Sequence, residues 1–342
     1  MRQLFDVMET KFPITSKTLR GDRTASDKKH VAYCDPPQAA NLAGGILYVI
    51  GGKVVKEERI NLEIWAESIP KEEKNHLLEN CSSESSFVKL IFPEDGELKK
   101  QLERLEEADT EPLLVISSDQ RILDLAAEKN VTAIGYQPPH SGSFLKADMV
   151  VEGFDEINPG FFLRTYERHF HIPWTITETK RCIIREFSMQ DLDALYDMYQ
   201  EAGMTDYMEA LYCYEEEREY QKAYIENMYR FYGYGMWLVF EKETGELVGR
   251  AGIEHSEKLE GEFELGYAVR TKYQKQGYAF EACQAIIAYA ATELEISKLH
   301  CLIQKDNTKS IKLAKKMGFS FEKELLDEEK TTFDFVKILT SR

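Results

Sequence analysis

The stretch YAVRTKYQKQGYAFEA, Tyr267–Ala282, joins two different patterns of apolar residues. Apolar and polar residues alternate before it, as in a β-strand, and apolar residues recur every four positions after it, as in a helix. The first N–H groups of a helix have no partner inside the helix and carry a partial positive charge. A helix that opens with Gly277 and Ala279 therefore predicts bare backbone suited to an anion such as phosphate. An ordinary strand-to-helix turn would also explain these two residues, because short glycine motifs are weak signals.

The strand expected before this turn has two unlike faces, because side chains alternate across a strand. One face carries Phe263, Leu265, Tyr267 and Val269, and the other carries Glu262, Glu264, Gly266, Ala268 and Arg270. The second face thus places a carboxylate beside two small residues, which leaves room for a ligand or a substrate. About thirty residues past the turn, Asn307 precedes a short helix that ends in Gly318 and Phe319.

The rest of the second half reads as one α/β unit of strands and helices. Ser188 is the expected N-cap of its first helix. The elements expected are a strand over 181–187, a helix over 188–202, an aromatic-rich helical region over 212–232, a hairpin over 236–255 with KETGE as its turn, a strand over 261–270, a helix over 277–295, a strand over 298–304, a helix over 308–318 and a final strand over 331–339.

This ordered set resembles the GCN5-related N-acetyltransferase (GNAT) family, in the style of the subgroup that acetylates the N-termini of ribosomal proteins. The family signature is Gln/Arg-x-x-Gly-x-Gly/Ala, which Gln274, Gly277 and Ala279 satisfy. The strand ELGYAVR before it and the helix after Asn307 agree in order and spacing. The resemblance covers roughly 179–339 and implies a GNAT fold, in which a mixed, mostly antiparallel sheet is flanked by helices.

The resemblance also implies acetyl-CoA as the cofactor and a set of residues that bind it. Backbone N–H groups from Gln274 to Ala279 would hold the pyrophosphate, and the backbone of Tyr267–Val269 would pair with the pantetheine arm like an added strand. Asn307 would contact the cofactor near its reactive end. The full set of expected cofactor-binding residues is Tyr267, Ala268, Val269, Gln274, Lys275, Gln276, Gly277, Tyr278, Ala279, Asn307 and Ser310.

Acetyl transfer to an amine needs a deprotonated amine, a polarised carbonyl and a proton for the leaving thiolate. Glu264 is the first candidate for the general base, and Glu254 on the neighbouring strand is the second. A solvated carboxylate on a strand is the alternative for Glu264. The N–H of Val269 is a candidate oxyanion donor. Many family members carry a tyrosine seven residues after the asparagine, where this chain has Ala314, so water or another residue must protonate the thiolate.

Aromatic residues gather where the family builds its pocket for the acceptor. They are MYRFYGYGMW, over 228–237, together with Tyr207, Tyr212, Tyr214 and Tyr220. Aromatic faces can hold cations. Core packing is the alternative role, and we expect it for most of them.

The first half reads as alternating strands and helices, which is typical of a doubly wound parallel sheet. Strands are expected over 44–55, 86–92, 111–118, 131–137 and 147–154, and helices over 94–108, 119–130 and 161–170. Pro173 ends the last helix, so we expect two domains, 1–174 and 175–342.

The run from 113 to 157 resembles the C-terminal half of a haloacid-dehalogenase-like (HAD) domain, a Rossmann-like α/β fold. Asp119 and Asp124 have the spacing of that family's late acidic motif, whose carboxylates normally hold magnesium. The nucleophile Asp-x-Asp is missing, because Asp35 is followed by Pro37 at the second position. We therefore expect a degenerate, non-catalytic domain without a metal, in which Ser118 and Asp119 cap a helix.

Composition limits the classes of function. The formal net charge is −17 and both halves are acidic, which argues against nucleic acid as a partner and is compatible with an amine-bearing substrate. The six cysteines form no Cys-x-x-Cys site, no signal peptide is visible, and no stretch is apolar enough to span a membrane. A cytoplasmic protein with free thiols is expected, and a homodimer is left open.

Three hypotheses follow from the sequence. The first is an N-acetyltransferase that moves the acetyl group of acetyl-CoA to a primary amine of a small molecule or a peptide. The second is a regulatory protein that binds coenzyme A without turnover, which Ala314 would favour. The third is a bifunctional protein with an active phosphohydrolase in its first domain.

Overall fold

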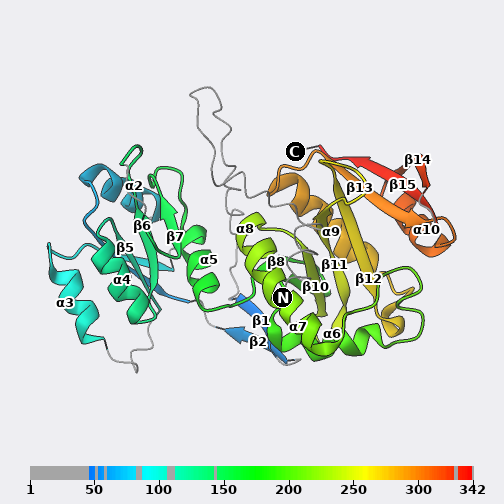
Figure 1. The fold of residues 1–342 in the computed structure, drawn as a ribbon, viewed down its shortest axis with the longest axis horizontal. Coiled ribbons are helices and arrows are strands. Elements are labelled where there is room, and N and C mark those ends of the chain that lie inside the picture. Colours follow the sequence, from blue (N-terminus) through cyan, green and yellow to red (C-terminus); the bar gives the residue numbers. More distant parts are fainter. Residues whose placement is uncertain are drawn as a thin grey trace. The chain divides into compact units, whose positions relative to one another are not determined.

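A computed structural model of the chain describes residues 46–50 and 53–57 as backbone only, and 60–81, 87–105, 112–141, 145–326 and 330–340 in full. The chain divides into two compact units, one that includes Val55–Trp174 and one that includes Thr175–Arg342 together with Val49–Val54 (Figure 1). Asp35, the first residue of the degenerate nucleophile motif, lies outside the described residues. The strand expected over 44–55 is two strands, β1 (Ile46–Ile50) and β2 (Lys53–Glu57), which form a small sheet of their own.

The first unit is built on a parallel sheet of five strands in the order β4-β3-β5-β6-β7. Its strands are β3 (Leu62–Glu67), β4 (Val88–Ile91), β5 (Leu113–Ser117), β6 (Thr132–Tyr136) and β7 (Met149–Val151), and its helices are α2 (Lys71–Cys81), α3 (Glu97–Arg104), α4 (Gln120–Glu128) and α5 (Pro159–His169). The sequence reading missed β3 and α2. In α2 only Leu77 and Cys81 are buried, so its apolar periodicity is too weak to predict a helix.

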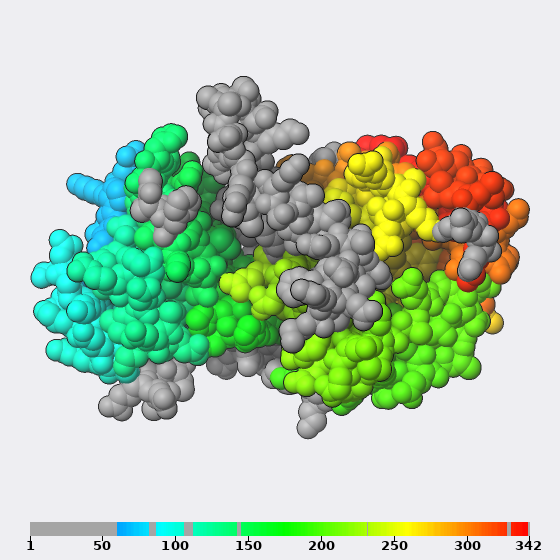
Figure 2. Space-filling model, in the orientation of Figure 1, coloured from blue at the N-terminus to red at the C-terminus, as the bar shows by residue number. Residues whose placement is uncertain are grey.

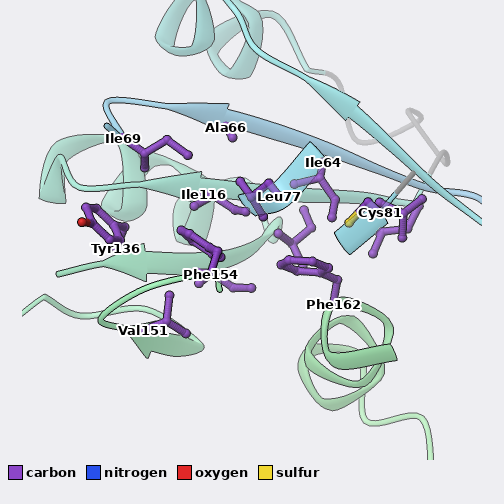
Figure 3. Close-up of a cluster of buried hydrophobic side chains, with 14 residues drawn as sticks. Ile64, Ala66, Ile69, Leu77, Cys81, Ile116, Tyr136, Val151, Phe154 and Phe162 are labelled. Carbon is purple, nitrogen blue, oxygen red and sulfur yellow. The ribbon is translucent and has the colours of Figure 1, made fainter. Parts of the chain in front are cut away.

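Two apolar cores cover the two faces of this sheet, as expected for a doubly wound unit. On one face, Leu77 of α2 and Phe162 of α5 pack with Ile64, Ile116 and Phe154 (Figure 3). On the other face, residues of α3 and α4 form the second core; they are Leu98, Leu102, Ile122, Leu123 and Ala126. These inward positions agree with the helical spacing in the sequence.

The acidic residues of the HAD resemblance have structural roles. Asp119 caps α4 by accepting a hydrogen bond from the Arg121 N–H at 2.9 Å, and its carboxylate also pairs with the Arg121 guanidinium. Asp124 accepts a hydrogen bond from Gln120 at 2.7 Å. At the end of β3, the buried Glu67 accepts hydrogen bonds from the N–H groups of Gly96 and Leu98, so a protein carboxylate occupies the N-terminus of α3. Within the described ranges, no three His, Cys, Asp or Glu side chains group in a way that could hold a metal ion.

The second unit is built on a sheet of eight strands in the order β14-β15-β13-β12-β11-β10-β9-β8. The pair β12–β13 is parallel and the other neighbours are antiparallel, which confirms the mixed, mostly antiparallel sheet. The strands are β8 (Thr175–Glu178), β9 (Cys182–Arg185), β10 (Met236–Glu241), β11 (Leu247–His255), β12 (Phe263–Val269), β13 (Lys298–Gln304), β14 (Ser320–Leu326) and β15 (Thr331–Ile338).

The helical elements of this unit lie on both faces of its sheet. They are the 3₁₀ turns η1 (Met189–Asp191) and η3 (Thr271–Tyr273), the π-helical turn η2 (Ile225–Tyr229), and the helices α6 (Leu192–Tyr199), α7 (Tyr214–Tyr224), α8 (Arg230–Tyr232), α9 (Tyr278–Thr292) and α10 (Thr308–Lys316). Trp237 of β10 contacts Tyr289 of α9, whereas the N–H of Met236, the residue before it, donates a hydrogen bond to the Tyr224 hydroxyl of α7. The predicted N-cap Ser188 is confirmed, since it forms a capping box with Asp191.

The sequence reading missed β8 and β14, which are the two edges of the sheet. An edge strand needs no continuous apolar face, and charged residues protect it from pairing with other chains. In β14 the side chains from Ser320 to Glu324 are all exposed, and the sequence SFEKELL shows no alternation that would predict a strand. None of the helices among the described residues is long and apolar enough to cross a membrane.

Candidate active site

A gap between two central strands forms the centre of the candidate site. Strand β12 pairs with β11 along seven residues, but with β13 only at Glu264 and His300. The main-chain N–H and C=O groups of successive residues in β12 point alternately to its two neighbouring strands. The N–H of Arg270 donates to Val248 of β11, so every second residue from Arg270 faces β11. The residues between them, Leu265, Tyr267 and Val269, therefore direct their main-chain groups toward β13. Beyond the single pair, these groups lie where an extended ligand could hydrogen-bond as an added strand.

The N-terminus of α9 carries the exposed amides that the sequence predicts. Gly277 is the N-cap, with φ at +87°, and as a glycine it has no side chain with which to cap the helix. Lys275 also has a left-handed backbone, with φ at +60°. The first bond from this turn into the helix is from the N–H of Glu281 to the Gly277 carbonyl, and the N–H of Gln274 donates to the Thr271 carbonyl at 3.3 Å. The N–H groups between them have no backbone partner among the described residues, which leaves them available to an anion.

These two features open into one cleft of about 620 Å³. The expected cofactor residues that line it are Tyr267, Ala268, Val269, Gln274, Lys275, Gly277, Tyr278, Ala279, Asn307 and Ser310. Gln276 does not line the cleft, because its side-chain amide donates to the Lys272 carbonyl at 2.6 Å. Lys309 and Lys316 add positive charge that the sequence reading did not assign to the site.

The loop before α9 is fixed from several sides, so its amides are held in place before a ligand binds. The Gln274 side chain donates to the Val269 carbonyl at 3.2 Å. Arg181, in the turn between β8 and β9, donates to the Gln276 carbonyl at 3.2 Å. Its guanidinium lies 4.0 Å from the centre of the Tyr278 ring. Its pKa is raised, chiefly by the hydrogen bond to Glu281, so it stays charged.

The segment after α6 forms the opposite wall of the cleft. Glu201 accepts hydrogen bonds at 2.6 Å from Arg270 and from the Thr271 N–H, which tie this segment to the end of β12. The Tyr207 hydroxyl reaches the Asp306 carbonyl at 3.5 Å, and in Figure 2 the green surface after α6 borders the orange surface that follows β13. The sequence reading missed Glu201, because a lone glutamate after a helix carries no signal.

Asn307 is the N-cap of α10, and Ala314 lies within that helix. The side-chain oxygen of Asn307 accepts a hydrogen bond from the Ser310 N–H at 3.1 Å, so it caps the helix, and Asn307 also lines the cleft. Ala314 is fully buried. The Tyr267 hydroxyl donates to the Ser310 carbonyl at 3.3 Å, one turn before Ala314.

The two candidate bases lie directly opposite each other on β11 and β12. Burial, and next the charge of Glu254, raise the pKa of Glu264 from 4.5 to about 7. Glu254 accepts a hydrogen bond from the buried Tyr224 hydroxyl at 2.7 Å, and that hydroxyl in turn accepts the Met236 N–H at 2.7 Å. The two carboxylates therefore lie in different environments: Glu254 accepts a hydrogen bond from the Tyr224 hydroxyl, and Glu264 has a pKa near neutral pH.

The aromatic residues divide between the core and the surface. Tyr224, Tyr229 and Tyr234 are buried, while Tyr207, Tyr212 and Tyr214 are exposed. Tyr224 donates to Glu254, whereas the sequence analysis named Tyr220, one helical turn earlier, among the aromatic residues near the expected acceptor pocket. Helical spacing shows which tyrosines share a face, and it does not show which carboxylate each one meets.

Comparison with known proteins identifies a family for the second half of the chain. The family described as Acetyltransferase (GNAT) domain matches residues 181–320. This part of the chain is a GNAT acetyltransferase domain. An uncharacterized N-acetyltransferase p20 of Bacillus licheniformis is 28% identical over 153 residues, which are 44% of this chain and 86% of that protein. Spermidine N(1)-acetyltransferase of Escherichia coli is 31% identical over 84 residues, 25% of this chain and 45% of that protein.

Two solved structures also resemble this GNAT domain. The ribosomal L7/L12 alpha-N-protein acetyltransferase RimL in complex with coenzyme A is 19% identical, with a TM-score of 0.44, covering 49% of this chain and 99% of that one. The GNAT-family acetyltransferase of Bacillus anthracis is 23% identical, with a TM-score of 0.41, covering 47% and 96%.

These findings confirm the GNAT fold of the second half and the prediction of an N-acetyltransferase enzyme, and GNAT acetyltransferases use acetyl-CoA. They give no support to the HAD-like interpretation of the first half. The parallel sheet of that half stands on its own as an observed architecture.

Proposed function

We propose that the second unit, Thr175–Arg342, binds acetyl-CoA and transfers its acetyl group to a primary amine, with Glu264 as the general base. The observation that supports this most strongly is the cleft in which the uncapped amides of α9 adjoin the unpaired edge of β12. A diphosphate and an amide-bearing arm are the chemical groups that such a cleft fits.

The cofactor would be held by main-chain groups and by a few cations. The amides from Gln274 to Ala279 would bind the pyrophosphate, and the edge of Tyr267–Val269 would pair with the pantetheine arm. Lys275, Lys309 and Lys316 would balance the phosphate charges. When bound, acetyl-CoA supplies an activated acetyl group, and coenzyme A departs as the free thiol.

Glu264 is suited to remove a proton from the acceptor. With a pKa of about 7, Glu264 is ionised in a large share of the molecules at neutral pH, and its carboxylate is a stronger base than an ordinary glutamate. Most substrate amines arrive protonated at this pH. Glu254 lies opposite and adds negative charge, which favours binding of an ammonium group on this face. Ala268 on the same face lines the cleft, whereas the Met236 side chain packs against Gly266, with its sulfur 3.2 Å from where a Cβ would stand.

The acceptor is a small-molecule or peptide amine. The named relatives include a spermidine acetyltransferase and a ribosomal-protein acetyltransferase, and both act on amines. The acidic pair Glu254 and Glu264 supports a cationic acceptor of either kind.

An assay of acetyl transfer to a panel of amines, in which the release of free thiol is measured, tests the proposal. Turnover with at least one amine, lost in Glu264→Gln while calorimetry shows unchanged binding of coenzyme A, is the expected result. Binding of coenzyme A without turnover on any amine would leave the regulatory hypothesis, and absence of binding would reject the site itself.

A further inference from the structure

A buried histidine and a buried aspartate lie beside Glu264, and the reaction as proposed above does not use them. His300 on β13 is the residue paired with Glu264 on β12, so the two side chains share one face of the sheet on strands about 4.8 Å apart. Asp334 on β15 lies on the same face, and its Oδ1 is 2.8 Å from His300 Nδ1. The exposed fractions are 5% for His300 and 0% for Asp334.

The contact with Asp334 sets the tautomer of the histidine. A carboxylate only accepts hydrogen bonds, so the Nδ1 of His300 carries the proton and Nε2 keeps a lone pair in the neutral ring. Nε2 lies 3.4 Å from Oε2 of Glu262, and within the described part of the chain it makes no well-aligned hydrogen bond.

An exit toward solvent lies next to this nitrogen. The Oε2 of Glu262 is 3.4 Å from His300 Nε2, and the Glu262 side chain is 31% exposed. Lys298 pairs with Glu262, and the pKa of Glu262 is lowered chiefly by that hydrogen bond, so this carboxylate stays ionised and can accept a proton transiently. Glu264 is the strand neighbour of His300, and His300 contacts Glu262, so the three side chains lie in order from a mostly buried carboxylate to a partly exposed one.

We propose that His300, oriented by Asp334, carries the proton from Glu264 to Glu262 and on to solvent after each acetyl transfer. The proposal rests on the function proposed above, in which Glu264 is the base. His300 acts through Glu264, so it is a positioning residue for proton transfer. The charged or titratable groups around this path are Glu262 and Glu264 on β12, Glu254 on β11, Lys298 on β13, Asp334 on β15, and Glu257 and Lys258 in the turn before β12.

The proton balance of the reaction requires such an exit. An acceptor that arrives as an ammonium ion loses two protons in becoming an amide, and the departing sulfur takes up one of them. The other proton moves from the amine nitrogen to Glu264, from Glu264 to His300 Nε2, and from there to Glu262 and water. The carboxylate then returns to its basic form for the next turnover.

The test measures kcat and KM of His300→Gln in weak buffer near pH 7, with both substrates saturating, and then adds imidazole. We expect kcat to fall about tenfold with KM for both substrates unchanged, because binding is not altered. Imidazole, a diffusible proton acceptor, should restore most of the lost rate. Asp334→Asn should act in the same direction, because an amide donor facing Nδ1 would place the ring proton on Nε2. His76→Gln in the first unit is the matched control.

Several results would overturn the inference. An unchanged kcat in His300→Gln would remove the histidine from the proton path. A kcat that falls without response to imidazole, together with a lower unfolding temperature, would assign His300 and Asp334 a purely structural role. Where His300→Gln does not fold, the surface variant Glu262→Gln decides the question, since it should lower kcat in weak buffer and respond to imidazole. A wild-type protein without turnover would reject the proposed function as well, whereas an active wild type with an indifferent His300→Gln would reject the relay alone.

Discussion

Replacing Glu264 by glutamine should change both stability and rate, and each change has a sign that the structure fixes. Glutamine keeps the shape of the side chain and removes its titration. The residue lies mostly buried opposite Glu254, and its pKa rises from 4.5 to about 7, chiefly through burial.

The magnitude follows from linkage between pKa and folding. Between pH 4.5 and about 7 the folded protein holds a proton on Glu264 that the unfolded chain has released. The unfolded state therefore binds fewer protons, and the free energy of unfolding falls as pH rises through this window. A rise of about 2.5 in pKa, at 1.36 kcal/mol each, corresponds to at most about 3 kcal/mol lost by pH 8.

The assay is urea unfolding of wild type and Glu264→Gln at several pH values from 4.5 to 8. The variant should gain stability relative to wild type as pH rises, by up to about 3 kcal/mol at pH 8. In the same variant kcat should fall about 10²–10⁴-fold, which is the usual contribution of a general base. Glu322→Gln, on the exposed edge strand β14, is the control and should change neither quantity.

If the free energy of unfolding of wild type and of Glu264→Gln changed with pH in the same way, the raised pKa of Glu264 would be refuted. A strong loss of rate without any change in the pH dependence of stability would show that Glu264 acts by position rather than by its shifted protonation. An unchanged pH–rate profile would remove it from the mechanism.

Three further predictions concern the neighbouring groups. Glu254→Gln should move the acidic limb of the kcat/KM profile to lower pH, because the charge of Glu254 contributes to the raised pKa of Glu264; an unmoved limb would exclude this coupling. Gly277→Glu should weaken binding of coenzyme A about 100-fold or more in calorimetry, since it adds a carboxylate at the anion site. Gly261→Glu, with φ at +76° and open space around it, should bind normally. Gly235→Ala should lower the free energy of unfolding by about 1–3 kcal/mol, because its Cβ would meet the Tyr224 hydroxyl at 2.6 Å; Gly233→Ala, which meets nothing within 4 Å, reports the backbone strain alone.

The sequence by itself determined the parts of the site that depend on neighbours along the chain. Gly277 and the apolar repeat of α9 predict a helix with exposed first amides, because capping is a local property. The alternation in β12 likewise places Glu264 on one face with Gly266 and Ala268.

Only the tertiary structure decided which distant side chains meet. Glu254 faces Glu264, His300 lies beside it with Asp334, and Glu201 ties the segment after α6 to β12. These contacts depend on the register between strands far apart in sequence, and periodicity within one strand does not fix that register. Burial follows from the same packing, so the pKa of Glu264, and with it the chemistry of the site, belongs to the fold rather than to the motif.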